Sequence, residues 1–407
     1  MAGVASSTSK HFPASPGNGS PLELLSTETA SREIGWMDQT AKHKLAILTN
    51  ILAPYRVPLF HRLASSFELE VLLSGNERTR SDWLTPEASA FPLSVRKSWG
   101  ITREHSTKGE SSDYDTHYFH FNPGYLMDLI VTRPDALLTA EMGLRTIIAL
   151  LYAKLTGVPV WIWWGGTLHT ERRIGKLRKL VRCLLVSVAD RWISYGETST
   201  DYLISIGVAN DRVLQIQNCV DEELFEENVP PLFSFTPRPV LLSAGQMIGR
   251  KGLDRLLMAA ADCQRRGYEF SLLLVGDGPD RQRLIELSKS LCLHNVHFKR
   301  GVSPHQMPSV YRSADCFVFP TLEDVWGLVV NEALWSGIPV LCSVYAGCAN
   351  ELVPQENLFD PLEPEDFVRV LQRAVEKRLA PADTSPLKTC GQVAGLIADE
   401  IHGVIAG

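Results

Sequence analysis

Short apolar runs alternate with amphipathic segments over most of the chain from Lys44 onward. Runs that are apolar at every position suit strands buried on both faces, which is typical of a parallel sheet covered by helices on each side. We therefore expect an α/β fold. The strands predicted in the first part of the chain are 44–50, 69–75, 116–121, 135–141, 158–164 and 190–196. Those predicted in the second part are 239–245, 270–278, 295–300, 315–321 and 338–343.

Length and a proline-rich seam divide the chain. A single hydrophobic core rarely serves more than about 250 residues, and this chain has 407. The strand pattern stops at NVPPLFSFTPRP, residues 228–239, and then starts again. We predict two Rossmann-like domains, 42–228 and 229–380, with parallel sheets facing across a cleft at the carboxyl ends of their strands. Residues 1–41 are expected to form a disordered extension, and 381–407 a tail that packs back on the first domain.

Charge and cysteine content exclude several classes of protein. The formal net charge is −6, so we expect no nucleic-acid partner, since such proteins usually carry a basic surplus. None of the eight cysteines forms a CxxC pair, which disfavours structural zinc and a disulfide framework and favours a reducing compartment. The sequence shows no secretory signal and no uninterrupted apolar span, so we expect a cytoplasmic protein.

The segment DVWGLVVNEALWSGIPVL carries a carboxylate at each end of its first half, Asp324 and Glu332. Between them, Gly327 and Leu328 are predicted to start a helix whose free backbone N–H groups suit a phosphate. Carboxylates accept hydrogen bonds from sugar hydroxyls. A ligand with hydroxyls at both ends and negative charge in the middle, such as a nucleotide-sugar, fits this layout. The alternative is that Asp324 caps the helix and Glu332 is a solvated helix residue.

A second loop, GQMIGRKG, starts at Gly245 and places Arg250 and Lys251 at the mouth of the next helix. These cations suit a diphosphate, although a plain surface turn is the alternative. The spacing fails the P-loop pattern, which disfavours a phosphate-transferring NTPase. In VGDGPDRQRL, Arg281 occupies the third glycine position of the dinucleotide fingerprint, which weighs against an NAD enzyme.

Several segments together resemble the family 4 glycosyltransferases, which have the GT-B fold. They are AGQMIGRKGLDRLL, VGDGPDRQRL, SADCFVFPTLEDVWGLVVNEALWSGIPV, NCVDEELF and ILAPYRVPLF. The resemblance covers roughly residues 42–377. It implies a retaining hexosyltransferase that needs no metal or other cofactor. It also implies that the second domain binds the nucleotide-sugar donor and the first domain binds the acceptor.

The resemblance assigns roles to individual residues. Lys251 is expected to neutralise the diphosphate and Glu332 to bind the ribose. Asp324 falls where the family has a glutamate beside the donor sugar, and the adjacent Glu323 is the alternative. Gln246 stands where many members have an arginine. The other residues expected at the donor are Gly245, Arg250, Gly327 and Leu328.

The first domain offers a histidine and a basic segment. His169, after the strand WIWWGG, is the candidate beside the donor sugar, and His120 is its rival. The alternative for either histidine is a purely structural role. The segment 171–185, ERRIGKLRKLVRCLL, pairs an apolar stripe with a cationic face. This pattern is typical of a helix on an anionic membrane surface, here the inner face of the plasma membrane. An ordinary amphipathic helix packed on the sheet is the alternative.

The sequence thus favours transfer of a sugar to a glycan or a lipid-linked acceptor, in polysaccharide or glycolipid biosynthesis. Two alternatives remain open. A non-catalytic nucleotide-sugar-binding subunit would fit the departures at Asp324 and Gln246. A GT-B nucleotide-sugar epimerase would share the phosphate site but would need acid and base residues in the cleft.

Overall fold

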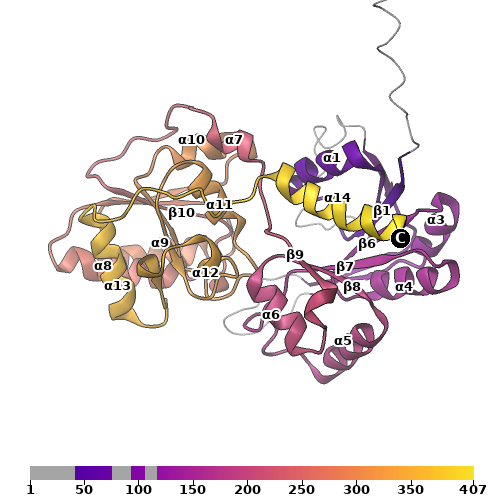
Figure 1. Cartoon of the computed structure of the whole chain (residues 1–407). Coiled ribbons are helices and arrows are strands. Elements are labelled where there is room, and N and C mark those ends of the chain that lie inside the picture. Colours follow the sequence, from indigo (N-terminus) through magenta and orange to yellow (C-terminus); the bar gives the residue numbers. More distant parts are fainter. Residues whose placement is uncertain (1–41, 76–92, 106–116) are drawn as a thin grey trace, which may run out of the picture. The chain divides into compact units, whose positions relative to one another are not determined.

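The computed structural model describes residues 42–75, 93–105 and 117–407 (Figure 1). Within it, His43–Gly407 forms one compact unit. The extension predicted for residues 1–41 lies outside the described residues. The predicted α/β class with two parallel sheets is confirmed, since one sheet has seven parallel strands and the other has six.

The seven-stranded sheet has the order β3-β2-β1-β6-β7-β8-β9. Its strands are β1 (Lys44–Thr49), β2 (Glu68–Leu73), β3 (Ser94–Lys97), β6 (Ala136–Ala140), β7 (Val160–Trp164), β8 (Arg191–Ser194) and β9 (Val213–Gln215). Its helices are α1 (Val57–Ser66), α3 (Gly124–Thr132), α4 (Leu144–Thr156), α5 (Lys176–Val188), α6 (Glu197–Ser205) and α14 (Cys390–Ala406).

Helices cover both faces of this sheet because successive strand residues point to opposite sides. In β1, Leu45 and Ile47 pack in the same core cluster as α1 and α14. Ala46 and Leu48 pack instead against α3 and α4. Trp164 of β7, on that second side, packs in a cluster with residues of α4, α5 and α6. Strands that are buried on both sides explain the uninterrupted apolar runs in the sequence.

One predicted parallel strand is wrong. Residues His117–Phe121 form β5, which pairs antiparallel with β4 (Ile101–His105) in a separate two-stranded ribbon. Phe119 and Phe121 are exposed, at 63% and 48%. An antiparallel ribbon leaves one face in solvent, whereas an inner parallel strand would have to bury both faces.

The six-stranded sheet has the order β12-β11-β10-β13-β14-β15. Its strands are β10 (Val240–Ala244), β11 (Ser271–Val275), β12 (Val296–Lys299), β13 (Cys316–Phe319), β14 (Val340–Ser343) and β15 (Leu358–Phe359). The helices are α7 (Glu222–Glu226), α8 (Leu253–Arg265), α9 (Arg281–Ser290), α10 (Met307–Tyr311), α11 (Leu328–Trp335), α12 (Ala349–Leu352) and α13 (Pro364–Val375). Helices α8 and α13 lie side by side on one face (Figure 1).

Strand order places two loops together. β10 pairs with β11 on one side and with β13 on the other, so the chain changes direction across the sheet at β10. In open parallel sheets such a switch point leaves a crevice at the carboxyl ends of the two strands. The loops that follow β10 and β13 therefore lie next to each other.

The last helix, α14, completes the core of the seven-stranded sheet. It runs alongside α1 in Figure 1. A capping box fixes its start, because Thr389 accepts a hydrogen bond from the Gln392 backbone and Gln392 accepts one from the Thr389 backbone. Ile397 and Ile401 are fully buried. No helix in the described ranges, α14 included, is long and apolar enough to cross a membrane.

Replacing Ile397 by Ala should lower the free energy of unfolding by roughly 2 to 5 kcal/mol, because it removes buried methyl groups and leaves a cavity. Leu396→Ala is the matched control, since the neighbouring Leu396 side chain is 37% exposed. Urea denaturation measures both variants. Equal stability losses for the two would contradict the packing of α14 described above.

Candidate active site

The loops after β10 and β13 are fastened to each other by their backbones. Gly252 has a φ of +64°, and a Cβ atom there would lie 2.0 Å from the Pro320 oxygen. The Arg250 carbonyl accepts hydrogen bonds from the Leu322 backbone at 2.7 Å and from the Thr321 hydroxyl at 3.1 Å. Only glycine permits this close approach, so Gly252 sets the geometry of both loops.

The two loops bring Lys251 and Asp324 into an ion pair. The Lys251 Nζ lies 2.5 Å from Asp324 Oδ2, and the side chains are 18% and 13% exposed. An Arg250 nitrogen lies 3.9 Å from the same oxygen. Burial opposes the charged form of Asp324, but the cations of Lys251 and Arg250 outweigh it and hold the pKa of Asp324 below its usual value. Asp324 is therefore ionised at neutral pH.

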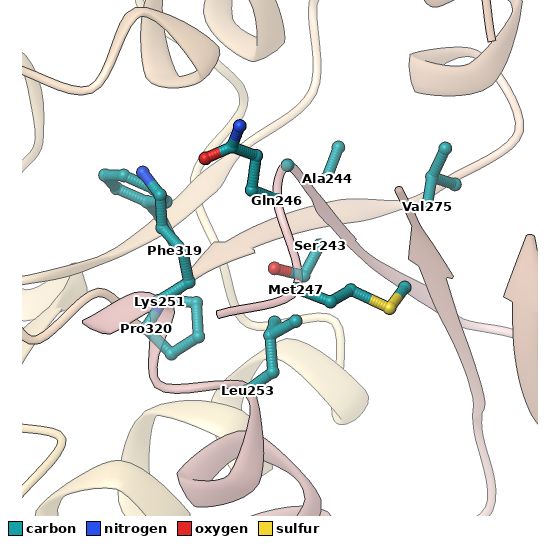
Figure 2. Close-up of a pocket in the computed structure, with 10 residues that line it drawn as sticks. Ser243, Ala244, Gln246, Met247, Lys251, Leu253, Val275, Phe319 and Pro320 are labelled. Atoms are coloured by element: carbon teal, nitrogen blue, oxygen red, sulfur yellow. The ribbon is translucent and has the colours of Figure 1, made fainter. Parts of the chain in front are cut away.

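A small hollow lies beside Lys251, and Gly245, Gln246 and Phe319 help to line it. Figure 2 shows the Lys251 amine and the Gln246 amide directed to the same side of the β10 loop. The Lys251 Nζ is 5.2 Å from the centre of the Phe319 ring. At Gly245 a Cβ atom would meet nothing within 4 Å, so the backbone there is open to an approaching ligand.

Helix α11 begins at Leu328, one residue later than Gly327, which caps it with a φ of +104°. A Cβ atom at Gly327 would lie 2.6 Å from the Phe319 ring. The cap is thus a bare backbone, and its free N–H groups suit an anion. Asp324 does not cap the helix: its Oδ1 accepts a hydrogen bond from the Trp326 backbone at 3.3 Å.

Glu332 on α11 is partly buried and accepts a hydrogen bond from a neighbouring side chain, so the alternative of a solvated residue is wrong. Burial raises the pKa of Glu332 to about 7, although a hydrogen bond from Tyr311 partly opposes the shift. The Tyr311 hydroxyl donates to Glu332 Oε2 at 2.7 Å. This bond fixes one carboxyl oxygen and leaves the other to face a ligand.

His169 reaches the loop that carries Asp324. Its Nε2 lies 2.9 Å from the Leu322 carbonyl oxygen, and its ring stacks on Tyr345 with the centres 4.5 Å apart. The rival, His120, lies on the β4–β5 ribbon with its Nδ1 2.9 Å from the Thr102 hydroxyl. Of the two histidines, only His169 is placed next to the predicted donor residues.

Glu323 and Asp324 have different partners. Glu323 forms an ion pair with Arg172 at 2.7 Å, and its side chain is 38% exposed. Asp324 is the carboxylate that meets Lys251. The two neighbouring carboxylates thus point to different cations, and Asp324 is the one beside the phosphate-binding residues predicted from the sequence.

A family model described as "Glycosyl transferases group 1" matches residues 225–386, which include both loops and α11. This part of the chain belongs to the family. The resemblance found in the sequence is therefore confirmed.

Two curated relatives indicate the range of the family. The chain is 24% identical over 277 residues to "Sulfoquinovosyl transferase SQD2" of Arabidopsis thaliana. This match covers 63% of the chain and 53% of the relative. The chain is 32% identical over 219 residues to a "GDP-mannose-dependent alpha-(1-6)-phosphatidylinositol monomannoside mannosyltransferase" of Mycolicibacterium smegmatis, covering 52% and 55%. The matches thus span about half the length of these relatives.

Two solved structures share the fold. Anabaena HepE in complex with UDP and glucose superposes with a TM-score of 0.62 at 17% identity, covering 89% of this chain and 98% of HepE. The galactosyltransferase WaaB in its apo form gives 0.63 at 15% identity, covering 89% and 99%. The predicted GT-B fold is confirmed by these neighbours.

Two residues that the sequence did not single out lie at sites that the structure describes. Tyr311 lies in a short helix, where the sequence gives it no evident polar role. Its hydrogen bond to Glu332 is seen only in the structure. Glu141 follows β6 directly and lines a cavity of about 490 Å³. Its position at the carboxyl end of a strand was the signal in the sequence that could have identified it.

Within the described ranges, no group of three or more His, Cys, Asp or Glu side chains is arranged to hold a metal ion.

The raised pKa of Glu332 predicts a pH dependence of stability. The folded pKa of about 7 exceeds the ordinary value of 4.5, so this stabilising contribution is complete below pH 4.5 and is lost as the pH rises through 7. Wild type should therefore lose about 3 kcal/mol between pH 5 and 8 relative to Glu332→Gln. Urea denaturation across this range measures the difference, and parallel curves for the two proteins would contradict the burial of Glu332.

Proposed function

We propose that the chain transfers a hexosyl group from a nucleotide-sugar to an acceptor hydroxyl, with retention of anomeric configuration and without a metal ion. The bond between the anomeric carbon and the diphosphate oxygen breaks, and the electron pair leaves with the nucleoside diphosphate. The acceptor oxygen bonds to the same face of that carbon, and its proton passes to the departing diphosphate oxygen. The observation that carries the proposal is the largely buried ion pair of Lys251 and Asp324 beside the open cap of α11.

Lys251 supplies the positive charge that this reaction needs. Negative charge grows on the departing diphosphate, and donors fixed in advance at that position lower the barrier. Arg250 and the backbone N–H groups after Gly327 add to the same field. Asp324, held ionised by these cations, accepts hydrogen bonds from the sugar hydroxyls. Glu332 takes the same part toward the ribose, where Tyr311 keeps its carboxyl group in place.

The acceptor is proposed to be part of a membrane lipid. Helices α3, α4 and α5 cover the same face of the seven-stranded sheet. Their outer surfaces carry large apolar side chains that are at least 43% exposed. In α5 the buried residue is Leu185 alone. The exposed apolar residues are Met127, Ile130 and Val131 on α3, Ile147, Leu151 and Leu155 on α4, and Leu177, Leu180, Leu184 and Val188 on α5.

The charge of α5 complements an anionic leaflet. Its exposed cations include Lys176, Arg178 and Lys179, on the same helix as the apolar stripe. A helix with both features lies in the interface of a membrane with its apolar side inserted. The Mycolicibacterium smegmatis relative is named for phosphatidylinositol monomannoside. A second relative, 30% identical over 141 residues (33% of this chain and 37% of the relative), is the "Lipopolysaccharide glucosyltransferase WaaG" of Escherichia coli. We propose peripheral attachment at the inner face of the plasma membrane.

Lys251→Ala should lower kcat/KM by about 100-fold or more, because one preorganised donor contributes roughly 3 to 4 kcal/mol to the barrier. The measurement is release of the nucleoside diphosphate from the nucleotide-sugar that the wild type consumes, with EDTA present. Arg255→Ala is the control, since Arg255 is an exposed cation on the following helix. In Lys251→Ala the Asp324 carboxylate loses its ion-pair partner, which can destabilise the fold. The double variant Lys251→Met with Asp324→Asn removes both charges and therefore repeats the test without this effect. Tight binding without turnover in the wild type would instead identify a non-catalytic subunit.

Replacing Leu180, Leu184 and Val188 by Ser should lower the partition coefficient onto phosphatidylglycerol vesicles at least about tenfold, because each side chain loses its apolar contact with the membrane. Vesicle flotation measures the bound fraction. The control is the triple replacement of Leu232, Met258 and Leu362 by Ser, residues that are 40%, 41% and 51% exposed outside the seven-stranded sheet. Equal binding of the two triple variants would refute the membrane assignment.

A further inference from the structure

A cavity of about 490 Å³ lies at the carboxyl ends of β6, β7 and β8. Glu141, Gly165 and Tyr195 line it where these three strands end, and α5 forms another part of its wall. Val325, the residue after Asp324, also borders it. The cavity therefore adjoins the loop on which the proposed donor-sugar carboxylate lies, and none of the predicted donor residues lines it.

Glu141 has an unusual backbone. Five non-glycine residues within the described ranges have positive φ, and Glu141 is one of them with a φ of 66°. Three of the others are at the ends of α3, α9 and α13, where a left-handed residue commonly terminates a helix. The fourth is an asparagine, which tolerates this conformation. Glu141 alone follows a strand directly, and such strain is typical of a functional position.

The surrounding structure holds Glu141 in this conformation. Its backbone N–H donates to the Trp163 carbonyl oxygen at 2.9 Å, and its own carbonyl oxygen accepts from the Thr146 hydroxyl. Arg145, which is 8% exposed, donates to the Ala140 carbonyl oxygen at 2.7 Å and to Glu141 Oε2 at 2.5 Å. The carboxylate is thus aimed by a buried arginine while its side chain remains 64% exposed.

The chemistry of the cavity wall differs from one side to the other. An ionised carboxylate accepts hydrogen bonds and donates none, so Glu141 suits a ligand hydroxyl. On the α5 side Leu177 and Val181 give the wall apolar surface, and Arg178 adds a cation. Arg182 of α5 also lines the cavity but is paired with Glu171. Leu177 also belongs to the exposed apolar stripe, at 75% exposure. A ligand with hydroxyls at one end and an apolar chain at the other fits this arrangement.

We infer that this cavity binds the hydroxylated headgroup of an amphiphilic acceptor, and that Glu141 receives the hydrogen bond of the hydroxyl to be glycosylated. The inference rests on the proposed transferase function and adds the residue that orients the acceptor. The apolar part of the acceptor extends along α5 toward the membrane.

The test is calorimetric titration with n-octyl β-D-glucopyranoside below its micelle-forming concentration, a probe with sugar hydroxyls and one short alkyl chain. The protein is saturated beforehand with whichever of UDP, GDP or ADP stabilises it. Glu141→Gln preserves shape and removes only the charge, and it should weaken probe binding at least about tenfold, as expected for loss of a hydrogen bond to a charged group. Glu223→Gln is the control, because Glu223 is an exposed carboxylate on α7 that pairs with Arg62 of α1.

Each outcome has a distinct meaning. Weaker probe binding by Glu141→Gln, with nucleoside diphosphate binding and melting temperature unchanged, supports the inference. Equal probe binding by Glu141→Gln and wild type, or no probe binding by wild type, overturns it. A fall in melting temperature with unchanged probe affinity would show that Glu141 serves only to neutralise Arg145. Failure of the proposed function is distinguishable, because then no nucleoside diphosphate binds to the wild type at all.

Discussion

The active-site geometry depends on the contact between Gly252 and Pro320. Because β10 and β13 are neighbours, the loops that follow them meet, and the absence of a side chain at Gly252 lets them touch. That contact places Lys251 and Asp324 in a largely buried ion pair. Removing one partner of a buried pair leaves an uncompensated charge and is strongly destabilising. Sheet topology, loop backbone and electrostatics are thus coupled at a single point.

Asp324 and Glu332 lie in different electrostatic surroundings, and their pKa values shift in opposite directions. Asp324 is kept ionised by two cations, whereas Glu332 sits without such help and titrates near neutrality, at about 7. Two carboxyl groups on one loop and helix therefore differ in charge at the same pH because their surroundings differ. The neighbouring Glu323 is engaged by Arg172 instead. His169 contacts the Leu322 carbonyl oxygen of the same loop. Loops that follow strands of both sheets therefore contribute to this region.

Much of the fold follows from the sequence because each sheet is built from continuous apolar runs. The family resemblance identified most of the candidate donor residues, because its motifs lie in the loops that follow β10 and β13. The ribbon of β4 and β5 was mispredicted, since a short aromatic run does not reveal which partner it pairs with. Short edge strands such as β15, with two residues, carry too little pattern to be recognised. The strained backbone of Glu141 and the hydrogen bond from Tyr311 arise from tertiary contacts, which no local pattern encodes.

The most direct measurement is calorimetric titration of the wild-type protein with UDP-, GDP-, ADP- and CMP-sugars, with EDTA present throughout and NAD as the comparison ligand. The pairing of Lys251 with Asp324 beside the open cap of α11 predicts saturable binding of one nucleoside class without metal. It also predicts that this binding is lost in Lys251→Ala. Binding of NAD alone, binding that requires a divalent cation, or equal affinity in Lys251→Ala would contradict the assignment of this pair to the donor site.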